Sequence, residues 1–357
     1  MRLELKDNFL SLVRLGIGHP AYIISYDVDW MSIEALAGKQ GLLAILVDGI
    51  ERLPEKQRPP KAILLEWIGS TLQSYEQRYA SYEKAIGSLT SFYNRHGFRM
   101  MILKGYACSL DWPKPAHRPC GDIDIWQFGS QKAADALLTK EIGIVVDNSH
   151  HHHTVFEWKG FTVENHYDFI NVHHQRLNEK LEKIFKELGA DDSNAVEVYD
   201  AKVNLPSPNL HCLFLLKHTI SHFAAAEITL RQVLDWAFFV EKHTKDIDWT
   251  WLLDVLEEFN MKDFFNCLNA ICVEDLGFDV NIFPSVQFSP GIIERVLNDI
   301  MSPEFSGEEP KRLLPRLLFK YRRWKANEWK HDLCYAESMW SSFWRGVFNH
   351  LLKPSSI

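Results

Sequence analysis

The sequence lacks three features that would place it in a specialised class of protein. No stretch reaches about 18 apolar residues without a charge, so we expect no membrane-spanning helix. The formal net charge is -8 rather than positive, which argues against bulk binding of nucleic acid through a positive surface. The first residues are charged and amphipathic without an uninterrupted apolar segment, so we expect no secretory signal.

Cysteine is scarce and scattered. The six cysteines form no CxxC pair and no dense disulfide framework: Cys108, Cys120, Cys212, Cys267, Cys272 and Cys334. We therefore expect reduced thiols in a cytoplasmic protein. Hydrophobic residues make up 46% and charged residues 24% of the 357 residues, which is typical of a folded globular protein. Two or three packed units are expected, because single cores rarely grow beyond roughly 250 residues.

The spacing of apolar residues divides the chain into three regions. Helical spacing over residues 1–96 predicts an N-terminal helical region. Short apolar runs alternate with a helical pattern over residues 97–200, which predicts a small mixed β-sheet core. Helical spacing returns over residues 201–357, which predicts a C-terminal helical region. The predicted fold class is therefore α+β.

The predicted strands of the middle region are short. They cover residues 98–103 (FRMMIL), 122–128 (DIDIWQF), 143–147 (GIVVD) and a pair within 154–170 (TVFEWKGFTVENHYDFI). One longer helix is expected over 131–143.

Two aspartates alternate with isoleucines in the second predicted strand. Successive side chains of a strand point to opposite faces, so Ile123 and Ile125 are expected in the core. Asp122 and Asp124 then share the other face. Two such carboxylates repel each other unless a cation lies between them, and Mg²⁺ prefers carboxylate oxygens together with substrate phosphates. A DxD pattern alone more often marks a solvated strand edge, so it needs support from its neighbours.

The segment FTVENHYDF supplies that support. Its alternation places Glu164, His166 and Asp168 on one face, and Val163 and Asn165 on the other. If this strand pairs beside the aspartate strand, Glu164 completes a set of three carboxylates, with Asp168 as an alternative. Divalent ions such as Mg²⁺ or Mn²⁺ held in this way stabilise the attacking and leaving oxygens of a displacement at phosphorus.

Flexible and cationic residues lie near the predicted carboxylates in sequence. Gly105 opens a helical turn after the first strand, where backbone N–H groups would be able to approach a triphosphate. Lys104 and Arg118 add positive charge suited to phosphate. His166 shares the face of Glu164 and is expected either to help position phosphate or a carboxylate, or to be a buried structural histidine.

These segments together resemble a known family. Residues 103–105 (LKG), the proline-containing loop 113–119, and the segments 121–125 (GDIDI) and 163–169 (VENHYDF) are similar to uncharacterised bacterial nucleotidyltransferases of the DNA polymerase β superfamily. The resemblance covers about residues 97–170. It implies a nucleotidyltransferase core that transfers an NMP group from an NTP, such as ATP, to an acceptor and releases pyrophosphate.

The resemblance also implies roles for individual residues. Gly105 matches the phosphate-facing glycine, Asp122 and Asp124 match the metal-binding pair, and Glu164 matches the third carboxylate. Tyr106 departs from the pattern, because the superfamily commonly has serine there. The interval between Gly105 and Asp122 is also long, and Glu164 replaces a commoner aspartate. A catalytically weak or inactive nucleotide-binding regulatory module of the same fold is therefore a second hypothesis.

Histidines suggest a third hypothesis, a metal hydrolase. The run His150–His153 is instead expected to be a polar loop entering a strand, because adjacent residues of an extended segment point apart and rarely converge on one ion. His218 and His222 have i, i+4 spacing, but a buried helix contact is expected since no third ligand is visible. Arg231 and Asp235 have the spacing of a helix salt bridge.

Aromatic and basic residues gather near the end of the chain, and we expect them to pack in the core rather than stack on nucleic-acid bases. They are Arg322, Arg323, Trp324, Trp329, Trp340 and Trp344. No residue pattern indicates the acceptor, and a protein, a small molecule and an RNA end all fit the predicted chemistry.

Overall fold

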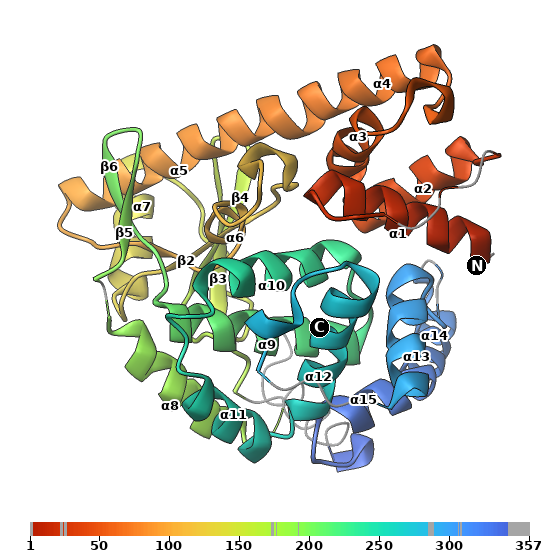
Figure 1. Cartoon of the computed structure of the whole chain (residues 1–357). Helices are drawn as coiled ribbons and strands as arrows, with labels where there is room; N and C mark the ends of the chain where they lie inside the picture. Colours follow the sequence, from red (N-terminus) through yellow and green to blue (C-terminus); the bar gives the residue numbers. More distant parts are fainter. Residues whose placement is uncertain are drawn as a thin grey trace.

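A computed structural model describes residues 3–341 except 22–23, 25–26, 173–174, 176, 192, 285–288, 306 and 308. Trp344 lies outside the described residues. The N-terminal third is helical, as predicted (Figure 1). Its elements are α1 (Leu3–Ile17), α2 (Trp30–Gln40), α3 (Leu43–Glu51), the turn η1 (Glu55–Gln57), α4 (Lys61–Thr71), the π-helical turn η2 (Leu72–Gln77) and α5 (Arg78–Arg95).

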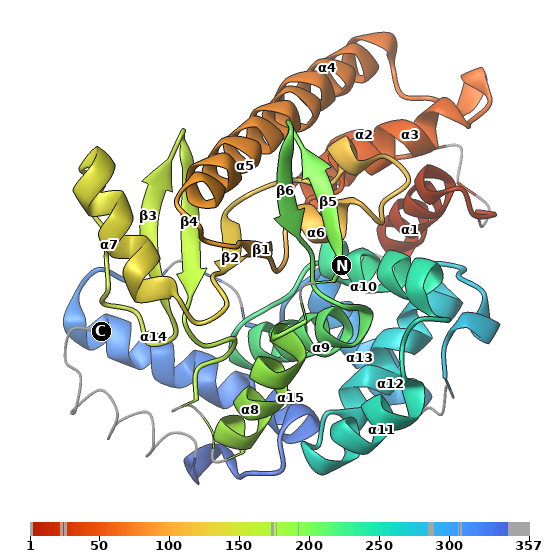
Figure 2. The ribbon, with the colours of Figure 1, turned by 90° about the vertical axis from the view of Figure 1, so that its left-hand side faces the viewer.

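The helices α4 and α5 join through η2 into one continuous rod (Figures 1 and 2). The α5 end of this rod packs on the sheet through buried residues at helical spacing, including Tyr82, Ile86 and Leu89. The apolar core of the sheet therefore includes residues of α5, a helix that lies in the predicted N-terminal region. The predicted domain limits at residues 96 and 200 stay a proposal.

One six-stranded mixed sheet occupies the middle of the chain, and it confirms the predicted α+β class. The strand order is β3-β4-β2-β1-β6-β5. The β4–β2 and β1–β6 pairs are parallel, and the other three pairs are antiparallel. The strands are β1 (Met101–Ile102), β2 (Ile123–Trp126), β3 (His153–Trp158), β4 (Phe161–His166), β5 (Ala195–Val198) and β6 (Ala201–Asn204). Between them lie α6 (Tyr106–Ser109), η3 (Pro115–His117), α7 (Gln131–Ile142) and α8 (Asn178–Gly189).

The two faces of the sheet differ in chemistry, as the alternation predicts. Ile123, Ile125 and Val163 are fully buried in an apolar cluster shared with α5 and α7. Asn165 lies on the same face and donates to Asp135 of α7 at 2.8 Å. The opposite face carries the polar residues of β2 and β4 and lies toward the C-terminal helices (Figure 2).

Two features of the sheet differ from the sequence prediction. The strand predicted over residues 143–147 is wrong, because only Asp147 forms a bridge, with Val155, and Val145 is 85% exposed. A short apolar run becomes a strand only where a neighbour supplies ladder hydrogen bonds. The hairpin β5–β6 was missed. Its two-residue turn places Tyr199 and Asp200 at positive φ, without the Asn-Gly pair that usually marks such turns.

Helices return after the sheet, as predicted. They are α9 (Pro208–Ala225), α10 (Leu230–His243), α11 (Trp249–Glu258), α12 (Lys262–Ala270), α13 (Pro290–Met301), α14 (Leu313–Ala326) and α15 (Glu328–Cys334), with the short turns η4 (Ile271–Asp275) and η5 (Val280–Ile282). Within the described ranges, none of the helices has the length and apolar character needed to cross a membrane. Trp329 packs against the main core, whereas Trp340 is 53% exposed, so the expected core packing is confirmed for Trp329 and wrong for Trp340.

Candidate active site

The predicted pairing of the acidic strands is confirmed. The strands β2 and β4 are parallel neighbours whose register sets Asp124 directly beside Glu164. Residues opposite each other on one face of a sheet bring their side chains together. Asp124, Glu164 and His166 each offer one ligand atom, and these three atoms lie within 4.8 Å of one another. The sheet therefore builds a compact donor set of two carboxylates and an imidazole.

Asp124 is the buried centre of this set. Its side chain is 2% exposed, and Oδ1 lies 2.7 Å from Lys104 Nζ and 3.1 Å from His166 Nε2. Burial alone would raise the pKa of Asp124, but Lys104 and His166 hold that pKa well below its ordinary value. Asp124 is therefore a carboxylate at neutral pH.

Lys104 is fixed by the backbone as well as by its charge. It follows β1, where Leu103 N donates to the Asp124 carbonyl oxygen at 3.0 Å and holds the two strands together. Burial would lower the pKa of Lys104, but attraction to Asp124 raises it above its ordinary value. Its Nζ also lies 6.0 Å from the centre of the Phe214 ring on α9. The ammonium group thus neutralises Asp124 beneath α9.

Gly105 occupies a position that only glycine suits. Its φ is +56°, and an added Cβ would lie 2.5 Å from the Tyr82 hydroxyl. That hydroxyl donates to the Asp122 carbonyl oxygen at 2.8 Å. Tyr106, which stands at the common serine position, is buried and donates its hydroxyl to Glu83 at 3.2 Å. The glycine therefore lets the chain pass close to the start of β2, while the tyrosine hydroxyl is engaged with α5.

Glu164 is the more accessible of the two clustered carboxylates. Its side chain is 25% exposed, and Oε2 lies 3.7 Å from His166 Nε2 and 3.9 Å from His153 Nδ1. Burial, followed by repulsion from Asp124, raises the pKa of Glu164 to about 7. The two carboxyl groups thus have pKa values shifted in opposite directions.

Asp122 lies at the edge of the cluster rather than inside it. It is exposed and precedes the first residue of β2. Among the described residues, its carboxylate is not part of a group of three close metal-ligand atoms. Its charge nevertheless contributes to the raised pKa of both Lys104 and Glu164. The structure therefore brings two of the three predicted carboxylates together and leaves the third nearby, toward solvent.

Arg118 is buried in a separate ion pair. Its Nε and Nη2 donate to the two carboxylate oxygens of Asp235 at 2.7 and 2.9 Å, and Nη1 donates to the Pro119 carbonyl oxygen. Trp112 also donates to Asp235. Asp235 thus binds Arg118 in place of the helix partner Arg231 that sequence spacing predicts. This bidentate ion pair holds the loop before β2 against α10.

The alternative ligands suggested by sequence lie apart from the acidic cluster. Asp168 pairs with Lys186 of α8 at 2.5 Å, so its carboxylate is engaged elsewhere. The rings of His218 and His222 are in tilted contact on α9 with centroids 4.3 Å apart, but neither belongs to a group of three metal-ligand atoms in the described part of the chain. Burial, then the nearby charge of Lys104, lowers the pKa of His218. Sequence spacing did not indicate that this face of α9 lies over the site.

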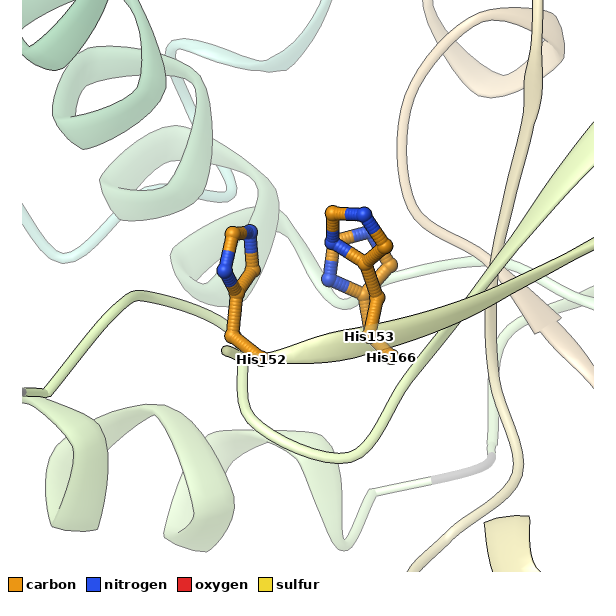
Figure 3. A group of neighbouring side chains, drawn as sticks. All are labelled: His152, His153 and His166. Carbon is orange, nitrogen blue, oxygen red and sulfur yellow. The ribbon is translucent and has the colours of Figure 1, made fainter. Parts of the chain in front are cut away.

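The structure agrees with the predicted backbone of the histidine run but not with the predicted directions of its rings. His150 to His152 form a loop and His153 begins β3, as expected. However, the prediction that adjacent imidazoles diverge is wrong, because His152, His153 and His166 offer nitrogens within 4.8 Å of one another (Figure 3). The His152 carbonyl oxygen accepts from the backbone N–H of Tyr167, which continues the antiparallel pairing of β3 and β4 by one residue. Burial lowers the pKa of His152 to about 2 and that of His153 to about 3.

Comparison with known proteins assigns the chain to a family. The model of the family described as uncharacterised nucleotidyltransferase matches residues 26–277, which is more than half of the chain. The chain belongs to this nucleotidyltransferase family. No curated protein matches the chain.

One solved structure similar to this nucleotidyltransferase is an antigenic nucleotidyltransferase-like protein from Paracoccidioides brasiliensis. The two are 14% identical, and the match covers 44% of this chain and 75% of that chain with a TM-score of 0.32. A likeness of this size carries no argument about the site. Nucleotidyltransferases generally use divalent metal ions, and the acidic and histidine cluster of this chain has a donor set that fits one.

Proposed function

We propose that this protein transfers an NMP group from an NTP to an acceptor and releases pyrophosphate, using Mg²⁺ or Mn²⁺ held by Asp122, Asp124 and Glu164. The observation that carries the proposal is the register of β2 and β4, which sets Asp124 beside Glu164 on one face. Membership of the nucleotidyltransferase family supports NMP transfer as the reaction class. When bound, the divalent ion would supply charge for the phosphates and align them for in-line displacement.

The chain's own residues would then handle the acceptor and the phosphates. An acceptor oxygen attacks the α-phosphorus, and the bond from that phosphorus to the bridging oxygen breaks, so pyrophosphate leaves. Glu164 is suited to take the acceptor's proton, because it is more exposed than Asp124. Lys104 is suited to exchange its contact with Asp124 for a phosphate oxygen when a metal ion neutralises that carboxylate.

The other predicted phosphate-binding residues are Gly105, Arg118 and His166, and the last two receive different roles. We propose that backbone N–H groups beside Gly105 face the triphosphate, although α6 is only four residues long and contributes little dipole. Arg118 would act as a positioning residue that holds the loop before β2, since Asp235 and Pro119 occupy its donors. His166 would orient Asp124, to which its Nε2 lies 3.1 Å.

A screen with α-labelled nucleotides tests the proposal. The protein is incubated with Mg²⁺, one of ATP, GTP, CTP or UTP, and cell extract, and both label transfer and pyrophosphate release are measured. We expect one nucleotide to leave label on an acceptor, and Asp124→Asn and Glu164→Gln to abolish this transfer. Asp168→Asn is the matched control, because Asp168 pairs with Lys186 outside the cluster. Equal loss in all three variants, or pyrophosphate release without label transfer, would contradict the proposal.

The second candidate is a nucleotide-binding module without turnover. The engaged hydroxyl of Tyr106, which donates to Glu83 rather than facing the phosphate-binding turn, favours it. This candidate predicts calorimetric binding of an NTP with Mg²⁺, weakened by Asp124→Asn, but no label transfer to any acceptor. A metal hydrolase built on the histidines would instead give phosphatase activity without pyrophosphate release.

A further inference from the structure

We propose that His152, His153 and His166 form a second metal site, for a transition metal ion such as Zn²⁺, beside the carboxylates proposed to bind Mg²⁺. The inference goes beyond the proposed function, because its ligands are mainly imidazoles and its ion is of a different class. The three rings come from the loop before β3, the first residue of β3 and the last residue of β4. They rise on the same side of the sheet ribbon (Figure 3).

The spacing of the three rings suits one ion. The ring centroids are 4.4 Å apart for His152 and His153, 5.2 Å for His153 and His166, and 5.6 Å for His152 and His166. One nitrogen from each ring lies within 4.8 Å of the other two. Zn–N bonds of about 2.0–2.1 Å in a tetrahedral site separate the nitrogens by roughly 3.4 Å. Rotation of the rings by about an ångström at the nitrogens would therefore close the site.

Two of the ring nitrogens are buried without a hydrogen bond. Nδ1 of His152 and Nδ1 of His153 have no hydrogen-bond partner in the described structure, and His153 as a whole is only 7% exposed. A buried polar atom without a partner carries a free-energy cost. Neutral imidazole nitrogens are ligands that Zn²⁺ and similar ions prefer, so a bound ion would remove this cost.

The contacts of His166 also require a positive group. Its Nδ1 lies 3.3 Å from the Asp168 carbonyl oxygen, which only accepts, so Nδ1 carries a hydrogen in that contact. Its Nε2 then faces Asp124 Oδ1 at 3.1 Å and Glu164 Oε2 at 3.7 Å, which are also acceptors. A metal ion on Nε2 would supply that positive group and would replace the contact to Asp124, which His166 keeps while the histidine site is empty. Backbone anchoring of the opposite ring nitrogen is the usual arrangement behind a ligating histidine.

The surrounding chain holds the site in place before any ion binds. The His152 carbonyl oxygen accepts from the backbone N–H groups of Tyr167 and Asp168 at 3.0 and 3.1 Å. The Tyr167 hydroxyl donates to the His150 carbonyl oxygen at 2.9 Å. Glu164 Oε2 lies 3.9 Å from His153 Nδ1 and belongs to the neighbouring Mg²⁺ site, so water would supply the fourth ligand of the histidine site. Three imidazoles favour Zn²⁺ or Co²⁺ over Mg²⁺, which prefers oxygen ligands.

A titration with Co²⁺ and Zn²⁺ tests the site. The full chain is treated with chelator, and binding is followed by Co²⁺ visible absorption and by Zn²⁺ calorimetry with excess Mg²⁺ present. We expect a single equivalent to bind, and His152→Gln and His153→Gln to weaken binding by about tenfold or more. His150→Gln, in the same histidine run but outside the group of three, should bind as the unaltered chain does. Circular dichroism verifies that each variant is folded.

Three outcomes would overturn the inference. They are loss of affinity in His150→Gln equal to that in His153→Gln, no binding by the unaltered chain, and full displacement of Co²⁺ by excess Mg²⁺. The Asp122→Asn variant separates this inference from the proposed function. It should lose label transfer yet keep Co²⁺ binding, because Asp122 is exposed and not part of the histidine group.

Discussion

The ion pair between Lys104 and Asp124 gives the sharpest test of the buried site's energetics. Nζ and Oδ1 are 2.7 Å apart, and the side chains are 14% and 2% exposed. Lys104→Met keeps most of the side-chain volume and removes the charge. Asp124 would then be a buried carboxylate beside Glu164, with His166 as its remaining polar partner.

The loss of unfolding free energy expected for Lys104→Met follows from burial of the remaining charge rather than from the lost attraction alone. At an effective dielectric constant of about 20, two charges at the separation of Lys104 and Asp124 attract by roughly 6 kcal/mol, which largely repays the loss of their hydration. Removing one partner leaves the other charge unpaired, and such losses cost about 3–5 kcal/mol of unfolding free energy. We expect Lys104→Met to lie in that range. The double variant with Asp124→Asn should cost less than the two single changes added together.

Urea unfolding of the unaltered chain, both single variants and the double variant measures this double-mutant cycle. Lys186→Met is the matched control, because Lys186 pairs with Asp168 at 2.5 Å but is 47% exposed. Exposed pairs contribute about 0–1 kcal/mol, so the control should change little. A cost below about 1 kcal/mol for Lys104→Met, or strict additivity of the two changes, would refute the reasoning.

Three further changes test other parts of the structure. Gly105→Ala should lower the unfolding free energy by about 1–3 kcal/mol, because φ is +56° and the new Cβ would meet the Tyr82 hydroxyl. Asp235→Asn should cost about 3–5 kcal/mol, since it leaves the buried Arg118 without its carboxylate. Lys217→Met should raise the unfolding free energy by up to about 3 kcal/mol at pH 7, because burial lowers the Lys217 pKa from 10.5 to about 8. The penalty for charging Lys217 is full below pH 8 and disappears as the pH rises toward 10.5, so the variant's advantage should disappear over that interval.

Denaturant titrations check all three changes, with the last repeated between pH 7 and pH 10.5. Combining Gly105→Ala with Tyr82→Phe removes the clashing oxygen and should recover part of the loss. If Asp235→Asn left the unfolding free energy unchanged, the ion pair with Arg118 would not be what holds the loop before β2. A Lys217→Met variant whose advantage stays constant with pH would show that the buried ammonium is not the cause.

Sequence alone predicted the features that depend on alternation along a strand. The period of two in GDIDI and in VENHYDF fixed which residues share a face, and the structure confirms Asp124 beside Glu164. Asp122 lies one residue before β2, so its position relative to Asp124 depends on the preceding loop rather than on alternation along the strand. Strand limits depend on hydrogen bonds to neighbouring strands, which a single segment does not reveal.

Contacts between distant segments were beyond prediction for the same reason. The partner of Asp235 is Arg118 from the loop before β2, although Arg231 on the same helix has the expected spacing. His152 and His153 lie close to His166 because β3 pairs with β4 at this end, and no local pattern of one segment reveals that neighbour. The placement of α9 over the polar face of the sheet likewise depends on burial of Phe214 with residues of α8.

The central claim is that the carboxylates on β2 and β4 hold the divalent ion that an NTP requires. Anomalous X-ray diffraction from crystals grown with Mn²⁺ and a non-hydrolysable NTP measures this directly, because manganese scatters anomalously and marks its own ligands. The account predicts a manganese peak within bonding distance of Asp124 and Glu164 and in contact with the triphosphate. A triphosphate bound elsewhere, or manganese without contact to either carboxylate, would contradict it.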